Sequence, residues 1–269
     1  MVSGPKSTEE GQIPLVDTNV PHQARVYDYW LGGKDNFTVD RATGDLALEA
    51  NPDIIMGVRA NRDFLIRAVR YLAGEAGIRQ FLDIGTGIPT ANNTHEVAQA
   101  VAPDSRVVYV DKDPIVLAHA RALLTSTEQG TCAYLDADAN DPDTILMLAE
   151  HTLDFSQPVA VTMLAILQVL RDPYAVVERL MQAVPSGSYL AISIPASDID
   201  AERQAAAAVH LAAGSPGVTL TFRSRPEVER FFAGLELVEP GVTTANRWRP
   251  LPETPDRELP AYVAVGRKP

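Results

Sequence analysis

Residues 81–90 read FLDIGTGIPT, and this stretch decides the fold. Its first residues are mostly apolar, which predicts a short buried strand that ends at two glycines, Gly85 and Gly87. The segment that follows, about residues 93–101, carries apolar side chains at helical spacing. A strand, a tight glycine turn and a helix open a nucleotide-binding α/β unit. Glycine is needed at that turn because a ligand must approach the backbone without meeting a Cβ atom.

Acidic side chains mark the ends of three consecutive predicted strands. The second strand is expected at residues 107–110 and the third at about residues 132–135. The carboxyl ends of parallel strands meet at one edge of a sheet, so these side chains would face a shared site. A carboxylate at the tip of the second strand can accept hydrogen bonds from both hydroxyls of a ribose. The aspartates at these strand ends are Asp83, Asp111, Asp136 and Asp138.

Two observations keep other interpretations of this stretch open. Each aspartate could instead cap the helix that follows it, and we expect that role for Asp113, which precedes Pro114 at a predicted helix start. A dinucleotide-binding turn would carry a third glycine, where this chain has Thr90. The spacing of the glycines therefore favours a nucleotide-like ligand without naming it.

Strands and helices alternate along the rest of the chain. Each of the first five predicted strands is followed by a helix, and these strands are expected at residues 81–84, 107–110, 132–135, 159–163 and 189–194. Alternation of this kind predicts a mainly parallel, doubly wound sheet. The last two predicted strands, about 236–242 and 261–265, have no helix between them and are expected to pair antiparallel. The fold class is therefore α/β, with a Rossmann-like doubly wound sheet of about seven strands and an antiparallel last strand.

The N-terminal part lacks strands. Residues 1–20 are polar and without periodicity, so we expect a flexible segment there. Residues 21–79 are predicted to form a helical cap. Its longest helix is expected to start at Asn51-Pro52, because Asn followed by Pro is a favoured helix start. The aromatic residues of its first helix, including Trp30, would either join the core or form a lid over a ligand.

Composition limits the class of partner and the compartment. The 269 residues carry a formal net charge of −12, whereas proteins that bind duplex nucleic acid or a membrane surface usually have a basic balance. The longest apolar run, residues 159–167, is shorter than the roughly 20 residues of a membrane span. The single cysteine, Cys132, fits a core position in a reducing compartment. With no basic and apolar leader at the start, we expect a cytoplasmic protein.

The motifs resemble those of class I S-adenosylmethionine (SAM) methyltransferases, and more narrowly a bacterial family formerly catalogued as a domain of unknown function. The resemblance extends from about residue 21 to the C-terminus and covers the glycine motif and the WRP at residues 248–250. The sequence YDYWLGGKDN at residues 27–36 is specific to the narrower family. The resemblance implies SAM as the cofactor, a Rossmann-like SAM-binding domain over residues 80–269, and a last strand inserted beside the fifth.

The resemblance also implies how the methionine part of SAM is bound. Asp83 would face the ammonium group, and Gly85, Thr86 and Gly87 would shape the pocket around it. Arg62 is a candidate for the carboxylate of the methionine part, with an exposed surface arginine as the alternative. Leu164, which follows the fourth predicted strand, is also expected to contact the cofactor.

The adenosine part would be bound by the next two strand ends. Asp111 is expected to bind the ribose, and Lys112 to lie beside the adenine ring. Asp138 and Ala139 are expected near the adenine amino group, with Asp136 as the alternative. No His, Cys or carboxylate cluster has the spacing of metal ligands, so no metal is expected.

The methyl acceptor is harder to predict, because methyl transfer from a sulfonium needs a base only if the nucleophile must lose a proton. The candidates for such a base are Tyr27, Tyr29, His95 and His22, and His95 could instead pack or cap its helix. Residues 164–168 read LAILQ and lack the Asn/Asp-Pro-Pro-aromatic motif of enzymes that methylate base amines or side-chain amides. Trp248 and Arg249 are expected to close over the substrate.

We therefore predict a SAM-dependent methyltransferase that acts on a small molecule, with no nucleic-acid or membrane partner. One alternative is a SAM- or nucleoside-binding regulatory protein without transferase activity. A less favoured alternative is an NAD-dependent oxidoreductase, against which the missing third glycine and the helix-free ending argue.

Overall fold

The computed structural model describes residues 17–269 apart from 124–125, 214–218, 253 and 255. Its centre is a mixed sheet with the strand order β3-β2-β1-β4-β5-β8-β6, and β7 pairs with β8 outside this path. The strands are β1 (Gln80–Ile84), β2 (Arg106–Asp111), β3 (Thr131–Asp136), β4 (Ala160–Leu164), β5 (Tyr189–Pro195), β6 (Glu236–Leu237), β7 (Thr243–Thr244) and β8 (Ala261–Arg267). The first five strands are parallel to one another, as their alternation with helices predicts.

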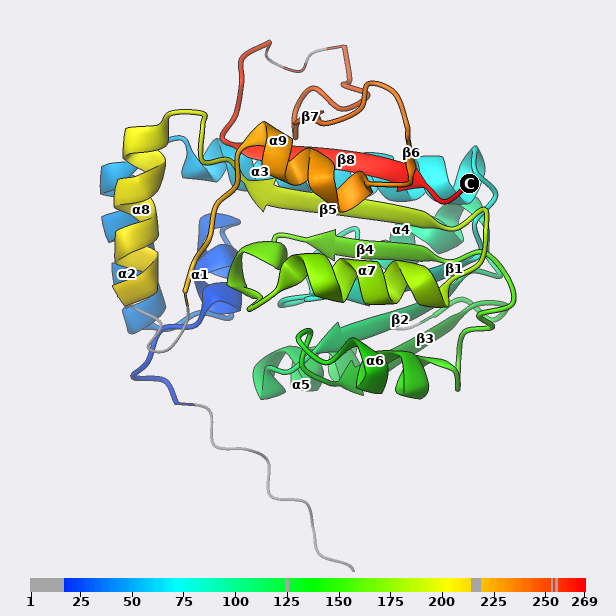
Figure 1. The fold of residues 1–269 in the computed structure, drawn as a ribbon. Coiled ribbons are helices and arrows are strands. Elements are labelled where there is room, and N and C mark those ends of the chain that lie inside the picture. The colour runs from blue at the N-terminus through cyan, green and yellow to red at the C-terminus, as the bar shows by residue number, and fades with distance from the viewer. Residues whose placement is uncertain (1–16, 124–125, 214–218, 253, 255) are drawn as a thin grey trace, which may run out of the picture.

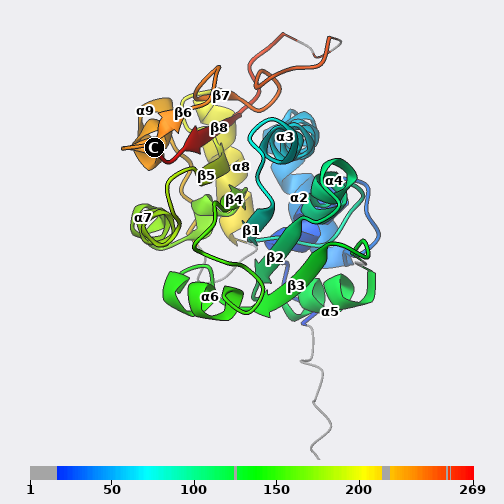
Figure 2. The ribbon, with the colours of Figure 1, turned by 90° about the vertical axis from the view of Figure 1, so that its right-hand side faces the viewer.

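Helices cover both faces of the sheet. Figure 2 shows α3, α4 and α5 on one face and α6, α7 and α9 on the other. The buried core accordingly has two main clusters, one on each side of the strands. The helices are α1 (Gln23–Trp30), α2 (Thr38–Ala50), α3 (Ile54–Gly74), α4 (Thr94–Val101), α5 (Pro114–Leu123), α6 (Pro142–Ala149), α7 (Pro173–Ala183), α8 (Ala201–Ala213) and α9 (Arg225–Glu229), with 3-10 turns η1 (Leu167–Val169) and η2 (Arg230–Phe232).

The end of the chain confirms the expected topology. β8 lies beside β5 and runs antiparallel to it, with Ile192 opposite Ala264. The strand predicted at residues 236–242 is instead broken into β6 and β7, both of which pair with β8. Pro240 interrupts it because proline has no N–H to give to a ladder. The sheet therefore has eight strands where about seven were expected.

Aspartate side chains begin two of the helices. Asp141 and Asp172 accept hydrogen bonds from the backbone N–H groups of Thr144 and Ala175. The expected start of α3 at Asn51 is wrong, because that helix begins at Ile54. Asn51 ends α2 instead, and its amide reaches across to the side chain of Gln204 in α8, with 2.9 Å between Nδ2 and Oε1.

Three helices, α1, α2 and α8, form what we call the cap. Figure 1 shows them beyond the carboxyl ends of the parallel strands. Val26, Trp30, Ala47 and Ala207 form a small core of their own within the cap, together with Val58 at the start of α3. The predicted boundary placed α3 in the cap and α8 outside it, whereas most of α3 packs on the sheet. Of the segment expected to be flexible, residues 1–16 lie outside the described part.

Candidate functional site

A cavity of about 490 Å³ lies between the cap and the carboxyl ends of the strands. Its floor comes from the ends of β1, β2, β4 and β5, and its opposite wall comes from α1, α8 and residues near 220–222. All ten residues predicted to bind the cofactor line it. They are Arg62, Asp83, Gly85, Thr86, Gly87, Asp111, Lys112, Asp138, Ala139 and Leu164.

The two glycines of the turn after β1 serve different needs. Both have left-handed backbones, with φ of +74° at Gly85 and +66° at Gly87. A Cβ atom on Gly85 would lie 2.5 Å from Cγ1 of Ile166, so the loop after β4 requires glycine there. A Cβ atom on Gly87 would meet nothing within 4 Å. The backbone at Gly87 thus borders open space, as a turn that receives a ligand should.

Asp83 is held at the tip of β1 by two hydroxyl groups. Thr94 Oγ1 donates to one carboxylate oxygen at 2.6 Å, and Thr162 Oγ1 donates to the other at 2.7 Å. Burial raises the pKa of this carboxyl group, and the two hydrogen bonds offset part of that rise. A cationic ligand group beside Asp83 would favour its ionised form and would be stabilised in return.

Asp111 is fixed by backbone N–H groups. Gly87 N donates to one carboxylate oxygen and Asp113 N to the other, each at 2.9 Å. Each oxygen keeps a second acceptor position, which suits a pair of ligand hydroxyls. Burial raises the pKa of Asp111, partly offset by these two bonds.

The neighbouring strand ends complete this side of the cavity. Lys112 Nζ lies 3.2 Å from a carboxylate oxygen of Asp138, so the two predicted adenine contacts pair with each other. Asp136, the alternative to Asp138, ends β3 opposite Asp111 but does not line the cavity. Arg62 is half-buried, and its guanidinium donates to Ala91 O and Asn92 O in the loop after the glycine turn.

Of the four candidate bases, Tyr27 and His22 line the cavity. The Tyr27 hydroxyl accepts a hydrogen bond of 2.8 Å from Asn61 Nδ2, and burial raises the pKa of Tyr27, so it stays protonated near neutral pH. Tyr29 points away and donates to Asp45. His95 is 2% exposed, and its Nδ1 lies 2.8 Å from the hydroxyl of Tyr109 beneath the cavity floor. We therefore set Tyr29 and His95 aside.

The expectation for Trp248 and Arg249 is also wrong. Trp248 is fully buried, edge-on to Phe64 with 5.3 Å between the ring centroids. Arg249 lies over the ring of Tyr71 and pairs with Glu75 at 2.9 Å. Neither residue lines the cavity, so both fasten the connection between β7 and β8 to α3.

Sequence reasoning missed the side chains that α8 and η1 bring to the cavity. Ala207 and Leu211 give α8 an apolar wall facing the strand ends. Gln168 donates from Nε2 to Ala165 O at 2.7 Å, while its buried Oε1 has no partner among the described residues. The buried Oδ1 of Asn61 likewise has no hydrogen-bond partner among the described residues. No local motif marks these residues, because they gather only when distant segments pack.

Two searches of the described residues concern other kinds of site. No group of three or more His, Cys, Asp or Glu side chains in the described ranges could hold a metal ion. Within the same ranges, every helix falls short of the length or apolar character that crossing a membrane requires.

Three solved structures are similar to this chain. A DUF574-family protein from Streptomyces avermitilis is 48% identical, with a TM-score of 0.91 over 96% of this chain and 100% of its own. A candidate methyltransferase from Thermobifida fusca is 43% identical, with a TM-score of 0.85 over 94% of this chain and 96% of its own. The plantazolicin methyltransferase BpumL, in complex with a substrate analog and S-adenosylhomocysteine (SAH), shares the fold at 10% identity, with a TM-score of 0.53 over 91% of this chain and 95% of its own.

The family comparison covers nearly the whole sequence. No curated protein matches the chain. The family model described as S-adenosyl methyltransferase matches residues 9–269, which include the strand-end carboxylates, the glycine turn and the cap. SAM is the cofactor of this family, so the alternatives of an oxidoreductase and of a binding protein without transferase activity lose their support. The chain belongs to the S-adenosyl methyltransferase family and is a SAM-dependent enzyme.

Proposed function

We propose that the enzyme transfers a methyl group to a small molecule bound between the strand ends and the cap. The observation that carries this proposal is a single cavity that joins the carboxylates of the strand tips to the apolar wall of α8. When bound, SAM supplies a methyl group already activated by the sulfonium, so the protein chiefly positions the acceptor and excludes water.

The residues at the strand ends fit the cofactor. Gly87 leaves open space beside the backbone, and Asp111 keeps an acceptor position on each carboxylate oxygen for the ribose hydroxyls. Asp83 would face the ammonium group and Arg62 the carboxylate of the methionine part. Lys112, Asp138, Ala139 and Leu164 would border the remainder of the cofactor, as expected from their places in the sequence.

The other half of the cavity is proposed to receive the acceptor. Its wall includes apolar side chains such as Leu211 and Phe222, and the polar residues Asn61 and Gln168 also line it. The unpaired side-chain oxygens of Asn61 and Gln168 are themselves buried, so an acceptor would reach them only if the amides turned toward the cavity. We therefore expect a largely apolar acceptor.

Catalysis by positioning is favoured, because the two candidate bases that line the cavity are both engaged: His22 contacts Asp113 through Nδ1, and Tyr27 holds its proton. Tyr27, which stays protonated, can orient the acceptor by a hydrogen bond but cannot take its proton near neutral pH. The acceptor would then react through a nucleophile that is already free of its proton, or that loses its proton to water after transfer.

Calorimetric titration with SAM and SAH tests the proposed cofactor site. We expect binding by the wild type and a loss of about 10- to 100-fold in Asp111→Ala, the loss of charge-assisted hydrogen bonds of about 1.5–3 kcal/mol. Asp104→Ala is the matched control, because Asp104 is exposed and pairs only with Arg79 at the surface.

Incubation with a small-molecule extract then tests the acceptor class. Formation of SAH by the wild type, lost in Asp111→Ala and kept in Asp104→Ala, would support a small-molecule acceptor. Full retention of binding in Asp111→Ala would contradict the site, and SAH formation that occurs with protein or nucleic acid alone would contradict the small-molecule acceptor.

A further inference from the structure

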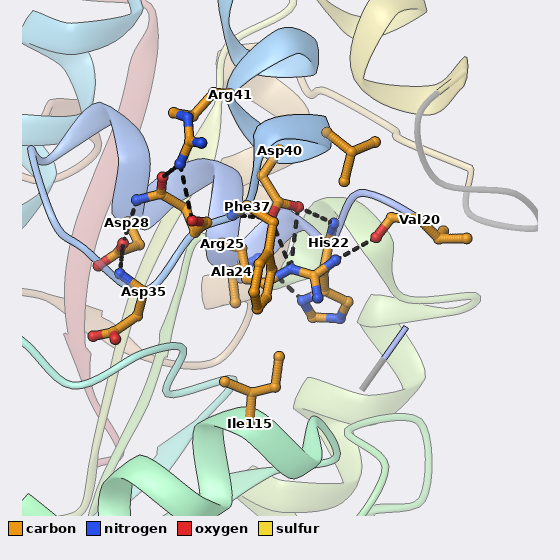
Figure 3. Close-up of polar contacts among 12 residues, drawn as sticks. Val20, His22, Ala24, Arg25, Asp28, Asp35, Phe37, Asp40, Arg41 and Ile115 are labelled. Carbon is orange, nitrogen blue, oxygen red and sulfur yellow. Dashed lines mark hydrogen bonds and ion pairs between the residues drawn. The ribbon is translucent and has the colours of Figure 1, made fainter. Parts of the chain in front are cut away.

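The segment before α1 is held by a buried ion pair. The Arg25 guanidinium lies 3.0 Å from the Asp40 carboxylate, and the two residues are 3% and 0% exposed. Arg25 also donates to Asp17 O and Val20 O, and the N–H of His22 donates to Asp40 at 2.9 Å. Figure 3 shows Val20, His22 and Asp40 gathered around Arg25. A buried ion pair whose other donors and acceptors are also satisfied fixes local geometry well. These contacts therefore hold residues 17–22 against α1 and α2.

The side chain of His22 connects this segment to the cofactor end of the cavity. Its Nδ1 lies 2.9 Å from a carboxylate oxygen of Asp113, in the loop between β2 and α5. An ionised carboxylate can only accept, so His22 donates to Asp113 when Nδ1 carries the ring proton. In the other tautomer the same nitrogen accepts from the N–H of Ala24 at 3.3 Å and caps α1. His22 itself lines the cavity and is 45% exposed.

Asp113 connects His22 to Asp111. The backbone N–H of Asp113 donates to the Asp111 carboxylate, and its own side chain accepts from Ile115 N at 2.8 Å. Burial alone would raise the pKa of Asp113, but the hydrogen bond and charge of His22 lower it below the usual range. The charged groups that face the His22 ring and its backbone are therefore Asp113, Asp111, Asp40 and Arg25.

We propose that His22 is a positioning residue of the cofactor site. By holding Asp113, it fixes the loop that aims Asp111 at the ribose, and it keeps residues 17–22 beside that end of the cavity. This inference rests on the proposed role of Asp111 in binding the cofactor.

SAH binding measured by calorimetry tests the proposal. His22→Ala should bind about tenfold more weakly than the wild type, which corresponds to the loss of one hydrogen bond. His22→Gln, which keeps a side-chain donor, should recover most of the affinity.

His119→Ala is the matched control. His119 also pairs with an aspartate, Asp35 at 3.4 Å, but does not line the cavity. It should bind SAH as the wild type does. Wild-type affinity in His22→Ala would overturn the proposal, and so would an equal loss in His119→Ala or a His22→Gln variant that binds as weakly as His22→Ala. If the wild type fails to bind SAH, the proposed cofactor site is wrong as well. Normal binding by His22→Ala would instead overturn only the role of His22.

Discussion

The strand-end side of the cavity and the cap side are built in different ways. At the strand ends, several contacts join residues 11 and 24 positions apart, such as Thr94 with Asp83 and Gly87 with Asp111, although Thr162 reaches Asp83 from 79 positions away. In the cap, the decisive contacts join residues far apart, such as Asn51 and Gln204. A cofactor site that all members of an enzyme class share can be encoded in a short sequence motif. The wall that selects the acceptor is instead assembled by packing, and we expect its residues to vary independently of those at the cofactor site.

The largest effect is expected at the glycine turn. Gly85→Ala should lower the free energy of unfolding by about 4 kcal/mol, from the left-handed backbone and the overlap with Ile166 together. Gly77→Ala, also left-handed at φ +72° but facing open space, should cost only about 1–2 kcal/mol. Urea denaturation of both variants measures the difference, and equal losses would show that Ile166 does not impose the glycine.

Removing the hydrogen bonds that Gln204 makes in the cap should lower stability without changing cofactor affinity. Gln204 is 4% exposed and bonds to Asn51, Ala196 O and Pro260 O, so Gln204→Met leaves these groups unpaired. We expect a loss of about 3 kcal/mol in the free energy of unfolding and a change in SAH affinity below threefold. The exposed Gln182→Met is the control. If SAH binding falls with stability, the two sides of the cavity are not independent.

Asp83→Asn should affect the cofactor without affecting stability. Because burial raises the pKa of Asp83, its charge is unfavourable in the folded protein without ligand, and a neutral amide should cost little. Affinity for SAM should fall about 30-fold, which corresponds to about 2 kcal/mol. Thermal unfolding and calorimetry on the same samples separate the two effects. A large drop in melting temperature with unchanged SAM affinity would make Asp83 a structural residue.

The smallest effect is a pH dependence on the acid side. Only the ionised Asp111 offers all of its acceptor positions, and its pKa is raised, so protonation weakens ribose binding as the pH falls. As the pH is lowered, SAH affinity should therefore begin to decrease before the pH reaches about 3.9, the value near which an ordinary aspartate titrates. In Asp111→Ala the part of this limb that comes from Asp111 should be lost, while the part from Asp83, whose pKa is also raised, should remain. An acid limb of the same size in that variant would assign it to another group.

The sequence predicted the strand-end side nearly in full and the cap side poorly. The residues at 83–87, 111–112 and 138–139 all reached the cavity, because strand ends and glycine turns follow local patterns. The roles expected of Trp248 and His95 were wrong, since burial depends on contacts with α3 and β2 that no motif encodes. Gln168 and the wall of α8 went unpredicted for the same reason.

The most direct test of the account is a crystal structure of the enzyme with SAH. We predict the ribose hydroxyls on the carboxylate of Asp111, the homocysteine part between Asp83 and Gly85, and open space between the sulfur and the wall formed by Leu211 and Phe222. SAH bound elsewhere, or a cap packed onto the sulfur with no room for an acceptor, would contradict it.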